Sequence, residues 1–300
     1  MKKSFLSLFT VLCALSVFTA CDDDKDGISS VYSGESLNLT LSGTTLSDKV
    51  VTTDNATITL KNIIPGEAEM ALPVTYTAGG FIGSVKNENR EVKVDATIRD
   101  GVADVKVDLA ETSPLGRNTF YINAQSLSLD FETSKKTVTL NGQEYEAKSL
   151  PLLVGSMGGP MLSQLFKGIR FGADGTIVVE FVRDDATYLT LAGYAFYNVV
   201  GDKIFVSLNL PAILSKSYIN PLESIVSMLY GVGIPLNLSV EGNKASFTIT
   251  RETMLPIIQV LPFVDKLNLI PEEYKTVLTE VSTIIQESTK FDLSLNLVKN

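Results

Sequence analysis

Apolar and polar residues alternate with a period of two through most of this chain, and no other feature constrains its fold as strongly. The pattern is clear where Leu37, Leu39 and Leu41 alternate with Asn38 and Thr40, and it recurs in many later segments. Successive side chains of a strand point to opposite faces of a sheet, so each such segment has one apolar and one polar face. Half-buried antiparallel strands require that division.

Short turn signals separate the strand-like segments. Glycine, asparagine and aspartate supply the positive φ angles that tight hairpins need. Five pairs of this kind lie between alternating segments: Asp100–Gly101, Asn141–Gly142, Asp174–Gly175, Gly201–Asp202 and Gly242–Asn243. We therefore predict a mainly antiparallel β protein with at least these five hairpins.

Helical patterns are confined to the second half of the chain. Apolar residues at helical spacing predict helices over 160–167, 220–229 and from 271 to about 285. Residues 253–266 are apolar but contain Pro256 and Pro262, so we expect only one or two short turns there. Alternation returns over 292–298 and predicts a closing strand.

These patterns predict a mainly β fold with an α+β C-terminal half. We expect an antiparallel sandwich or barrel, with short apolar helices packed on the sheet or closing it. A composition shift divides the chain into an antiparallel β domain at 31–147 and an α+β domain at 148–300. A single larger barrel closed by helices remains an alternative.

The first 20 residues have the form of a signal peptide. Lys2 and Lys3 precede an apolar run that is shorter than the roughly 20 residues needed to span a bilayer. A small residue, Ala20, stands directly before Cys21, and this arrangement resembles the lipobox of bacterial lipoproteins. The resemblance implies cleavage before Cys21, acylation of that cysteine and anchoring by lipid, as several acyl chains allow.

An acidic tether follows over residues 21–30. Like charges packed as closely as Asp22, Asp23 and Asp24 repel one another, which predicts a solvated linker. The segment also resembles the export signal of Bacteroidetes surface lipoproteins, which implies an outer-membrane location exposed at the cell surface; anchoring on the periplasmic side of the outer membrane is the alternative. A calcium loop is the alternative, but its twelfth position would be Ser33, where a glutamate is required.

Two further runs are similar to parts of uncharacterised Bacteroidetes lipoproteins that contain a domain of unknown function. They cover residues 168–177 and 58–67, and they resemble calycin-like or related β domains. The resemblance implies a β fold and an envelope location. It implies no catalytic residue, because none is known for such families.

Composition excludes several classes of function. Loss of Lys2 and Lys3 with the signal changes the net charge from −9 to −11, which disfavours nucleic-acid binding. The chain has no histidine, so the usual general base near neutral pH and the commonest metal ligand are missing. Its two cysteines, Cys13 and Cys21, belong to the signal and the lipid anchor. We expect no cofactor and no metal site.

Catalytic motifs are weak. Ser156 lies in a glycine-rich run that resembles a nucleophile elbow, but Val154 replaces the first glycine and no histidine could activate the serine. We interpret residues 155–160 as a flexible turn before a helix. A hydrolase could use two carboxylates, but the neighbouring acids Asp184–Asp185 and Glu272–Glu273 usually point apart along a chain. We assign the first pair to a polar loop and the second to the start of a helix. We therefore predict no enzyme and no catalytic residue.

Two groups of residues are candidates for ligand binding. Tyr188, Tyr194 and Tyr197 could stack on a glycan, although tyrosines in strands usually serve packing. Ile258, Leu261 and Phe263 could line an apolar pocket between sheet and helices, or could simply close the core.

The expected function is thus a lipid-anchored envelope protein that binds an apolar or glycan ligand at the cell surface. The alternative is a structural or interaction component of an outer-membrane assembly with an unknown protein partner. A carboxylate-dependent hydrolase comes third. A ligand-binding protein predicts a cavity lined by apolar or tyrosine side chains. A structural or interaction protein predicts a filled core and a contiguous exposed apolar patch. A hydrolase predicts two buried acids with perturbed pKa values.

Overall fold

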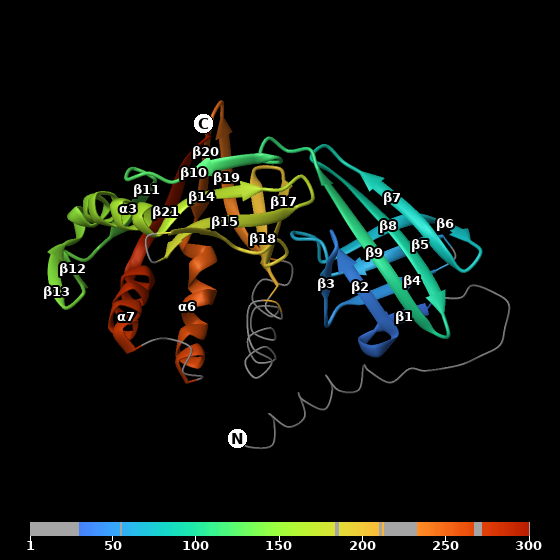
Figure 1. Cartoon of the computed structure of the whole chain (residues 1–300). Coiled ribbons are helices and arrows are strands. Elements are labelled where there is room, and N and C mark those ends of the chain that lie inside the picture. Colours follow the sequence, from blue (N-terminus) through green and yellow to red (C-terminus); the bar gives the residue numbers. More distant parts are fainter. Residues whose placement is uncertain are drawn as a thin grey trace, which may run out of the picture.

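The computed structural model describes residues 30–54, 56–183, 186–209, 212, 233–266 and 272–299. Two large sheets follow one another along the chain, and helices accompany the second (Figure 1). All five predicted hairpins are present, and the turn residues Asp100, Gly101, Asn141 and Gly142 have the positive φ angles expected of them. The predicted fold class, mainly β with an α+β C-terminal half, is confirmed.

The first sheet is a half-barrel of nine strands in the order β1-β4-β5-β6-β7-β8-β9-β2-β3. All its pairings are antiparallel except that of β2 with β9. The strands are β1 (Ser30–Ser33), β2 (Leu37–Leu41), β3 (Thr44–Leu46), β4 (Val50–Thr53), β5 (Thr57–Lys61), β6 (Glu69–Thr77), β7 (Gly80–Lys86), β8 (Arg90–Arg99) and β9 (Val102–Glu111). A 3₁₀ turn, η1 (Gly34–Ser36), separates β1 from β2.

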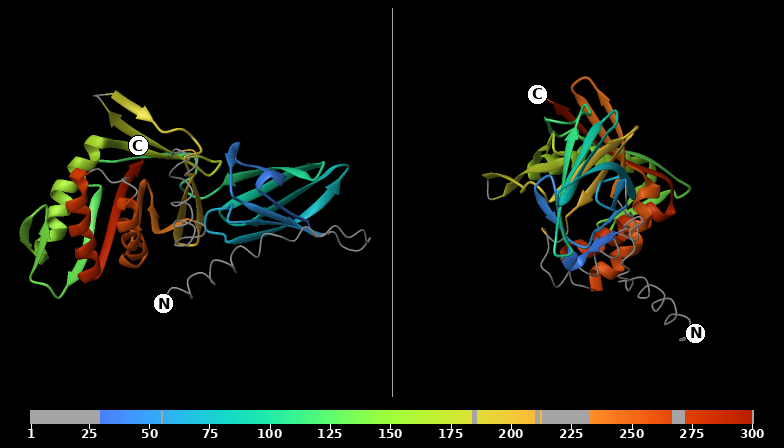
Figure 2. Two further views of the ribbon diagram at one scale, coloured as in Figure 1. Left: turned by 90° about the horizontal axis from the view of Figure 1, so that it is seen from below. Right: turned by 90° about the vertical axis from the view of Figure 1, so that its right-hand side faces the viewer.

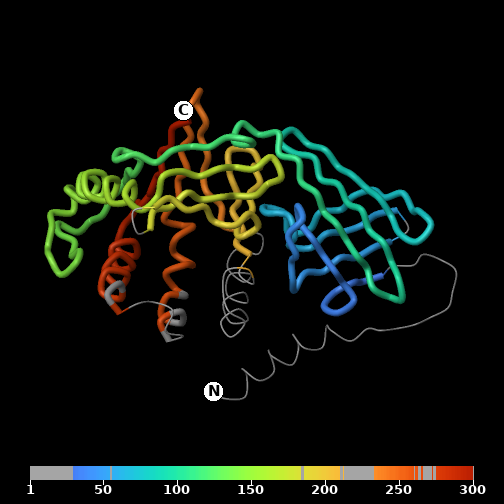
Figure 3. Tube along the Cα trace, in the orientation of Figure 1, coloured from blue at the N-terminus to red at the C-terminus, as the bar shows by residue number. Residues whose placement is uncertain are grey.

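The second sheet closes into an eight-stranded antiparallel barrel. Closure joins β10 to β21, strands that are distant in sequence and can be followed by their green and dark red colours in Figure 3. The barrel strands are β10 (Asn118–Tyr121), β14 (Phe166–Phe171), β15 (Thr176–Arg183), β17 (Ala195–Val200), β18 (Lys203–Leu208), β19 (Ile234–Glu241), β20 (Lys244–Ile249) and β21 (Ser288–Lys299).

Four strands add to this barrel or lie beside it. β11 (Leu127–Thr133) pairs with β21, and β16 (Ala186–Leu189) pairs with β15. β12 (Thr137–Leu140) and β13 (Gln143–Glu146) form a separate hairpin. Because β10 and β11 pair with barrel strands, the change of sheet falls between Glu111 and Asn118. The composition shift at residue 148 comes later in the chain.

Side chains fill the space inside each part of the fold. The half-barrel encloses an aliphatic core that includes Leu39, Ile58 and Val92. The barrel interior contains an aromatic cluster in which Phe171 stacks on Phe247 at a ring distance of 5.4 Å. A third core lies between β11, β21 and the helices. The interior of a barrel of eight strands is just wide enough for side chains to fill, as here, or for one small ligand.

The helices lie on the barrel side of the molecule. Short turns η2 (Ala147–Ser149) and α2 (Leu150–Leu153) lead into a π-helical turn, η3 (Val154–Gly158), and then α3 (Gly159–Leu165). Residues 155–160 are therefore helical, and the interpretation of a flexible turn was wrong. Two longer helices, α6 (Arg251–Lys266) and α7 (Glu272–Glu287), pack against each other and against β21. No helix in the described residues is long and apolar enough to cross a bilayer.

The structure tests several of the elements predicted for the second half of the chain. The helix predicted from residue 271 is confirmed as α7, and the strand predicted over 292–298 lies within β21. The prediction of short turns over 253–266 was wrong, because α6 is continuous through Pro256 and Pro262. Burial of Met254 and Ile258 in the third core offsets the hydrogen bonds that the two prolines remove. The helix predicted over 220–229 lies outside the described residues.

Candidate functional site: an exposed apolar helix face

The segment α2–η3–α3 lies directly on β11 through its glycines. A Cβ atom added to Gly159 would overlap the carbonyl oxygen of Ala124, and one added to Gly158 would lie 2.9 Å from a methyl group of Leu127. Gly155 faces the backbone of Leu127 as well. Glycine is the residue that permits so close an approach between a helix and another backbone. The small residues of this helix therefore face the protein.

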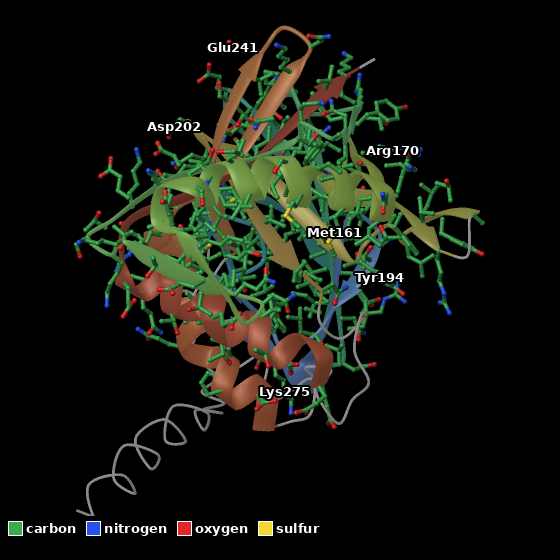
Figure 4. The ribbon with its side chains drawn as sticks, turned by 90° about the vertical axis from the view of Figure 1, so that its left-hand side faces the viewer. Met161, Arg170, Tyr194, Asp202, Glu241 and Lys275 are labelled. Atoms are coloured by element: carbon green, nitrogen blue, oxygen red, sulfur yellow. The ribbon has the colours of Figure 1, made fainter. Side chains whose placement is uncertain are left out.

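Four large apolar residues of the same segment face solvent, whereas Leu150 is buried in the third core. Leu152, Met157 and Met161 are 72%, 66% and 63% exposed, and Leu165 is exposed too. Figure 4 looks at this side of the molecule, with Met161 labelled on the helix. An amphipathic helix normally buries its large apolar residues. We call these four residues the helix face.

The π-helical turn brings the four residues of the helix face into one row. In a regular α-helix, residues four apart are neighbours on the surface, as Met157, Met161 and Leu165 are. Leu152 lies five residues before Met157, and the wider turn over Val154–Gly158 accommodates that additional residue. Turns of this type are frequent at functional sites.

No charged residue interrupts the helix face. Residues 149–166 contain no aspartate, glutamate, lysine or arginine, although the chain as a whole has a net charge of −9. Lys148 and Lys167 flank the segment, and the ammonium group of Lys167 turns back to the carbonyl oxygen of Ser163 at 3.1 Å. The surface is thus uncharged along the whole segment, and the helix face is apolar.

Replacement of Gly159 by alanine tests how the helix is held. The new methyl group would overlap the Ala124 backbone, which cannot move without disturbing β11. We expect a loss of about 1–3 kcal/mol in the free energy of unfolding, measured by urea titration followed by circular dichroism. Ser156→Ala, at an exposed position of the same segment, is the matched control, and an equal loss in both variants would contradict this packing.

The three candidate tyrosines do not form one site. Tyr197 lies inside the barrel, completely buried, and its hydroxyl donates to the carbonyl oxygen of Gly172 at 2.8 Å. Tyr188 is exposed on β16, where its ring stacks on Phe181 at 5.7 Å. Tyr194 is half-buried just before β17. Alternation along β17 explains why Tyr197 points inward and away from the other two.

The apolar candidates lie on α6. Ile258 is buried in the third core together with Ile284 and Ile285 of α7, and Leu261 is half-buried. Phe263 is within α6, but its side chain is outside the described residues, as are Cys21 and Asp22, Asp23 and Asp24. Ile258 thus closes a core between two helices.

A second cluster, at the junction of the two sheets, is polar and buried. Arg90 and Glu111 stand opposite each other on β8 and β9. Arg90 donates to the Glu67 carboxylate at 2.6 Å, and Glu111 donates its backbone N–H to the carbonyl oxygen of Ala173 at 2.6 Å. From the barrel, the side chain of Asn198 donates to the carbonyl oxygen of Pro65 at 2.6 Å. These contacts join the half-barrel to the barrel.

The electrostatics of this junction are unusual. Arg90 is 2% exposed and Glu111 is 4% exposed. Both carboxylate oxygens of Glu111, and Nε and Nη1 of Arg90, have no hydrogen-bond partner among the described protein groups. Burial raises the pKa of Glu111 to about 7, although Arg90 and Ser113 oppose that shift. Burial, and then the charges of Glu111 and Asp174, raise the pKa of Tyr197.

The junction has one property that a hydrolase would need, a buried acid with a raised pKa. Its groups are nevertheless enclosed between the two sheets, and Glu111 is joined to the hairpin of β14 and β15 through its own backbone. A carboxyl group enclosed between two sheets can titrate, but a general acid must come within hydrogen-bond reach of its substrate, which this burial prevents. We therefore assign the cluster to holding the two sheets together.

Neither site was predicted from the sequence. The signal for the helix face was present, since Gly155 and Gly159 are four residues apart and share one side of a helix. The junction left no local signal, because its members come from positions 67, 90, 111 and 198. Within the described residues, no group of three or more aspartate, glutamate, histidine or cysteine side chains is placed to hold a metal ion.

Comparisons with known proteins add no relative. No protein-family model matches the sequence, and no curated protein and no solved structure is significantly similar to the chain. What defines the chain is its fold, a half-barrel joined to a closed antiparallel barrel, together with its exposed helix face.

Proposed function

We propose that this chain is a non-enzymatic interaction component of the cell envelope, anchored by lipid at Cys21, and that the helix face binds a protein partner. One observation carries the proposal: a helix that buries glycines and exposes Leu152, Met157 and Met161. Exposed apolar patches of this kind mark interaction sites. The lipid anchor and the surface location rest on the sequence of residues 1–26.

The chemistry of the face indicates what the partner offers. A surface without charge over 18 residues would leave a charged partner group desolvated and unpaired. The partner therefore presents an apolar, uncharged surface. Methionine side chains adapt to partners of different shape, and two of the four residues are methionine.

Binding of a small apolar or glycan ligand has less support. Aromatic side chains occupy the barrel interior, where a ligand of a barrel protein would lie. Ile258 belongs to a core shared by α6 and α7. Tyr188 is exposed and Tyr197 is completely buried, so the two rings cannot form one surface on which a glycan could stack.

A photo-crosslinking amino acid at position 161 tests the proposal in the intact cell. We expect the full chain with this group at 161 to form a protein adduct on irradiation, and the adduct to be lost when Leu165→Glu is added. The charge at 165 would be buried unpaired in the contact, which costs several kcal/mol. Mass spectrometry of the adduct identifies the partner.

The matched control carries the same group at Val31, which is 63% exposed but lies on the half-barrel. Adducts of equal yield from positions 31 and 161 would indicate chance encounters and contradict the proposal. Absence of a protein adduct at 161 would also contradict it. Labelling of lipid alone would assign the helix face to the membrane surface instead.

A further inference from the structure

The strand β16 forms the outer edge of an arm. β15 and β16 leave the barrel together and project beyond it, as Figure 2 shows. One side of β16 pairs with β15 through Glu180–Arg183, and no other described strand pairs with its second side. All four residues of β16 are exposed. Closure of the barrel removes most strand edges from this sheet, but it leaves this one.

Backbone geometry shows which groups of β16 face outward. Thr190 donates its N–H to the carbonyl oxygen of Val179, one step beyond the pair of Leu189 and Glu180. Hydrogen-bonded and non-hydrogen-bonded residues alternate along an antiparallel pair. Tyr188 therefore directs its N–H and C=O to β15, and Thr187 and Leu189 direct theirs to the open edge.

This edge is complementary to itself. If two β16 strands run antiparallel about a two-fold axis at Tyr188, Thr187 of each copy lies opposite Leu189 of the other. Residues that face each other in this way exchange both of their backbone hydrogen bonds, so the pair of strands gains four. A two-fold contact of this type uses the same surface on both copies.

Charge favours this pairing over other contacts between two copies. Two chains that each carry a net charge of −9, or −11 without the signal, repel one another across most of their surfaces. β16 contains no charged residue, and the nearest acid on β15, Glu180, forms an ion pair with Arg170 at 3.5 Å. Asp184 and Asp185 directly precede β16 in the sequence, and antiparallel pairing keeps the N-terminal ends of the two strands apart. β16 also lacks the lysine, proline or bulge with which proteins usually protect an edge.

We infer that β16 is the pairing edge for a second copy of this chain, with the two strands antiparallel about a two-fold axis at Tyr188. The two Tyr188 side chains then meet as a non-hydrogen-bonded pair, while each also stacks on its own Phe181. Four residues from each copy make a small contact compared with the roughly 1,200–2,000 Å² of a standard interface. The dimer is therefore weak in dilute solution and is favoured when both copies are confined to one surface.

Cysteine cross-linking in the intact envelope tests this register. In the full chain carrying Tyr188→Cys, the two thiols would lie at the separation of a non-hydrogen-bonded pair, which a disulfide can bridge. We expect a disulfide-linked dimer on mild oxidation. In Thr187→Cys the two thiols would be offset by two residues along the strand, beyond bridging distance, and we expect no dimer.

A third variant tests the backbone bonds without disturbing the fold. Thr187→Pro, added to Tyr188→Cys, removes an N–H that faces the open edge, and proline is tolerated at such positions of edge strands. We expect the cross-linked fraction to fall roughly tenfold, because two of the four new hydrogen bonds are lost. The wild-type chain controls for Cys13 and Cys21, which lie outside the described residues.

Three outcomes would overturn the inference: a monomeric Tyr188→Cys chain, equal cross-linking of the Thr187→Cys chain, or no effect of Thr187→Pro. Each can occur while position 161 still forms its adduct, because the helix face and the edge of β16 are different surfaces. Failure of this pairing is thus distinct from failure of the proposed function.

Discussion

Replacement of Arg90 by methionine is expected to lower the free energy of unfolding by about 3–5 kcal/mol at pH 8. Arg90 is the buried cation of the junction, bonded to Glu67 at 2.6 Å and opposite Glu111 in the register of β8 and β9. Without it, the pKa of Glu111 rises further, so at pH 8 the folded chain must either keep an unpaired buried carboxylate or bind a proton, and Glu67 loses its ion pair. An unpaired buried charge costs far more than the net gain that a buried ion pair provides.

Urea titration followed by circular dichroism measures this loss. Arg99→Met is the matched control, because Arg99 is exposed at the other end of the same strand, and we expect a change within about 0.5 kcal/mol. The double variant Arg90→Met/Glu111→Gln removes both charges and should recover part of the loss. A change in Arg90→Met no larger than that in Arg99→Met would show that the junction does not depend on this cation.

The hairpins could be predicted from sequence because their determinants are local. Asp100–Gly101 and Asn141–Gly142 adopt the positive φ angles that Asp-Gly and Asn-Gly pairs favour in hairpins, so two residues suffice to identify each turn. Strand alternation is equally local. The order of the strands is not, since the pairing of β10 with β21 joins residues about 180 positions apart, and no short pattern encodes it.

The two sites were missed for different physical reasons. Glycines are poor helix formers, so residues 155–160 favour a turn when only propensity is considered. Close packing on β11 and the loop before it reverses that preference, because only glycine allows the approach of Gly159 to the Ala124 backbone. At the junction, Arg90 and Glu111 occupy positions that look like ordinary ends of exposed strands. Their burial depends on contact with the barrel, which a pattern within β8 or β9 cannot indicate.

Replacement of Glu111 by glutamine is expected to stabilise the protein, and the gain should depend on pH. The pKa of Glu111 is raised from 4.5 to about 7 in the folded chain. Below pH 4.5 the carboxyl group is protonated in both the folded and the unfolded chain, so it makes no pH-dependent contribution. Between pH 4.5 and 7 the folded chain binds more protons than the unfolded one, and wild-type stability falls as the pH rises.

Above pH 7 the full cost of the buried charge is present. A shift of this size corresponds to about 3 kcal/mol, since one pKa unit is 1.36 kcal/mol. Glutamine stays neutral, so the difference between the variant and the wild-type chain should grow from its value at pH 4.5 by about 3 kcal/mol at pH 8. Groups that titrate equally in both chains cancel from this difference, which urea titrations across that range measure directly.

The same comparison separates two roles for the junction. If the stability difference rises between pH 4.5 and 7 as expected, Glu111 is a charge that the fold tolerates at a cost, next to Arg90 and within the field of Asp174. A flat difference would mean that Glu111 is ionised and fully stabilised by Arg90 throughout, contrary to its buried and unbonded oxygens. The sign also matters: a gain that shrank with rising pH would require a depressed pKa, which burial of an unbonded carboxylate cannot produce.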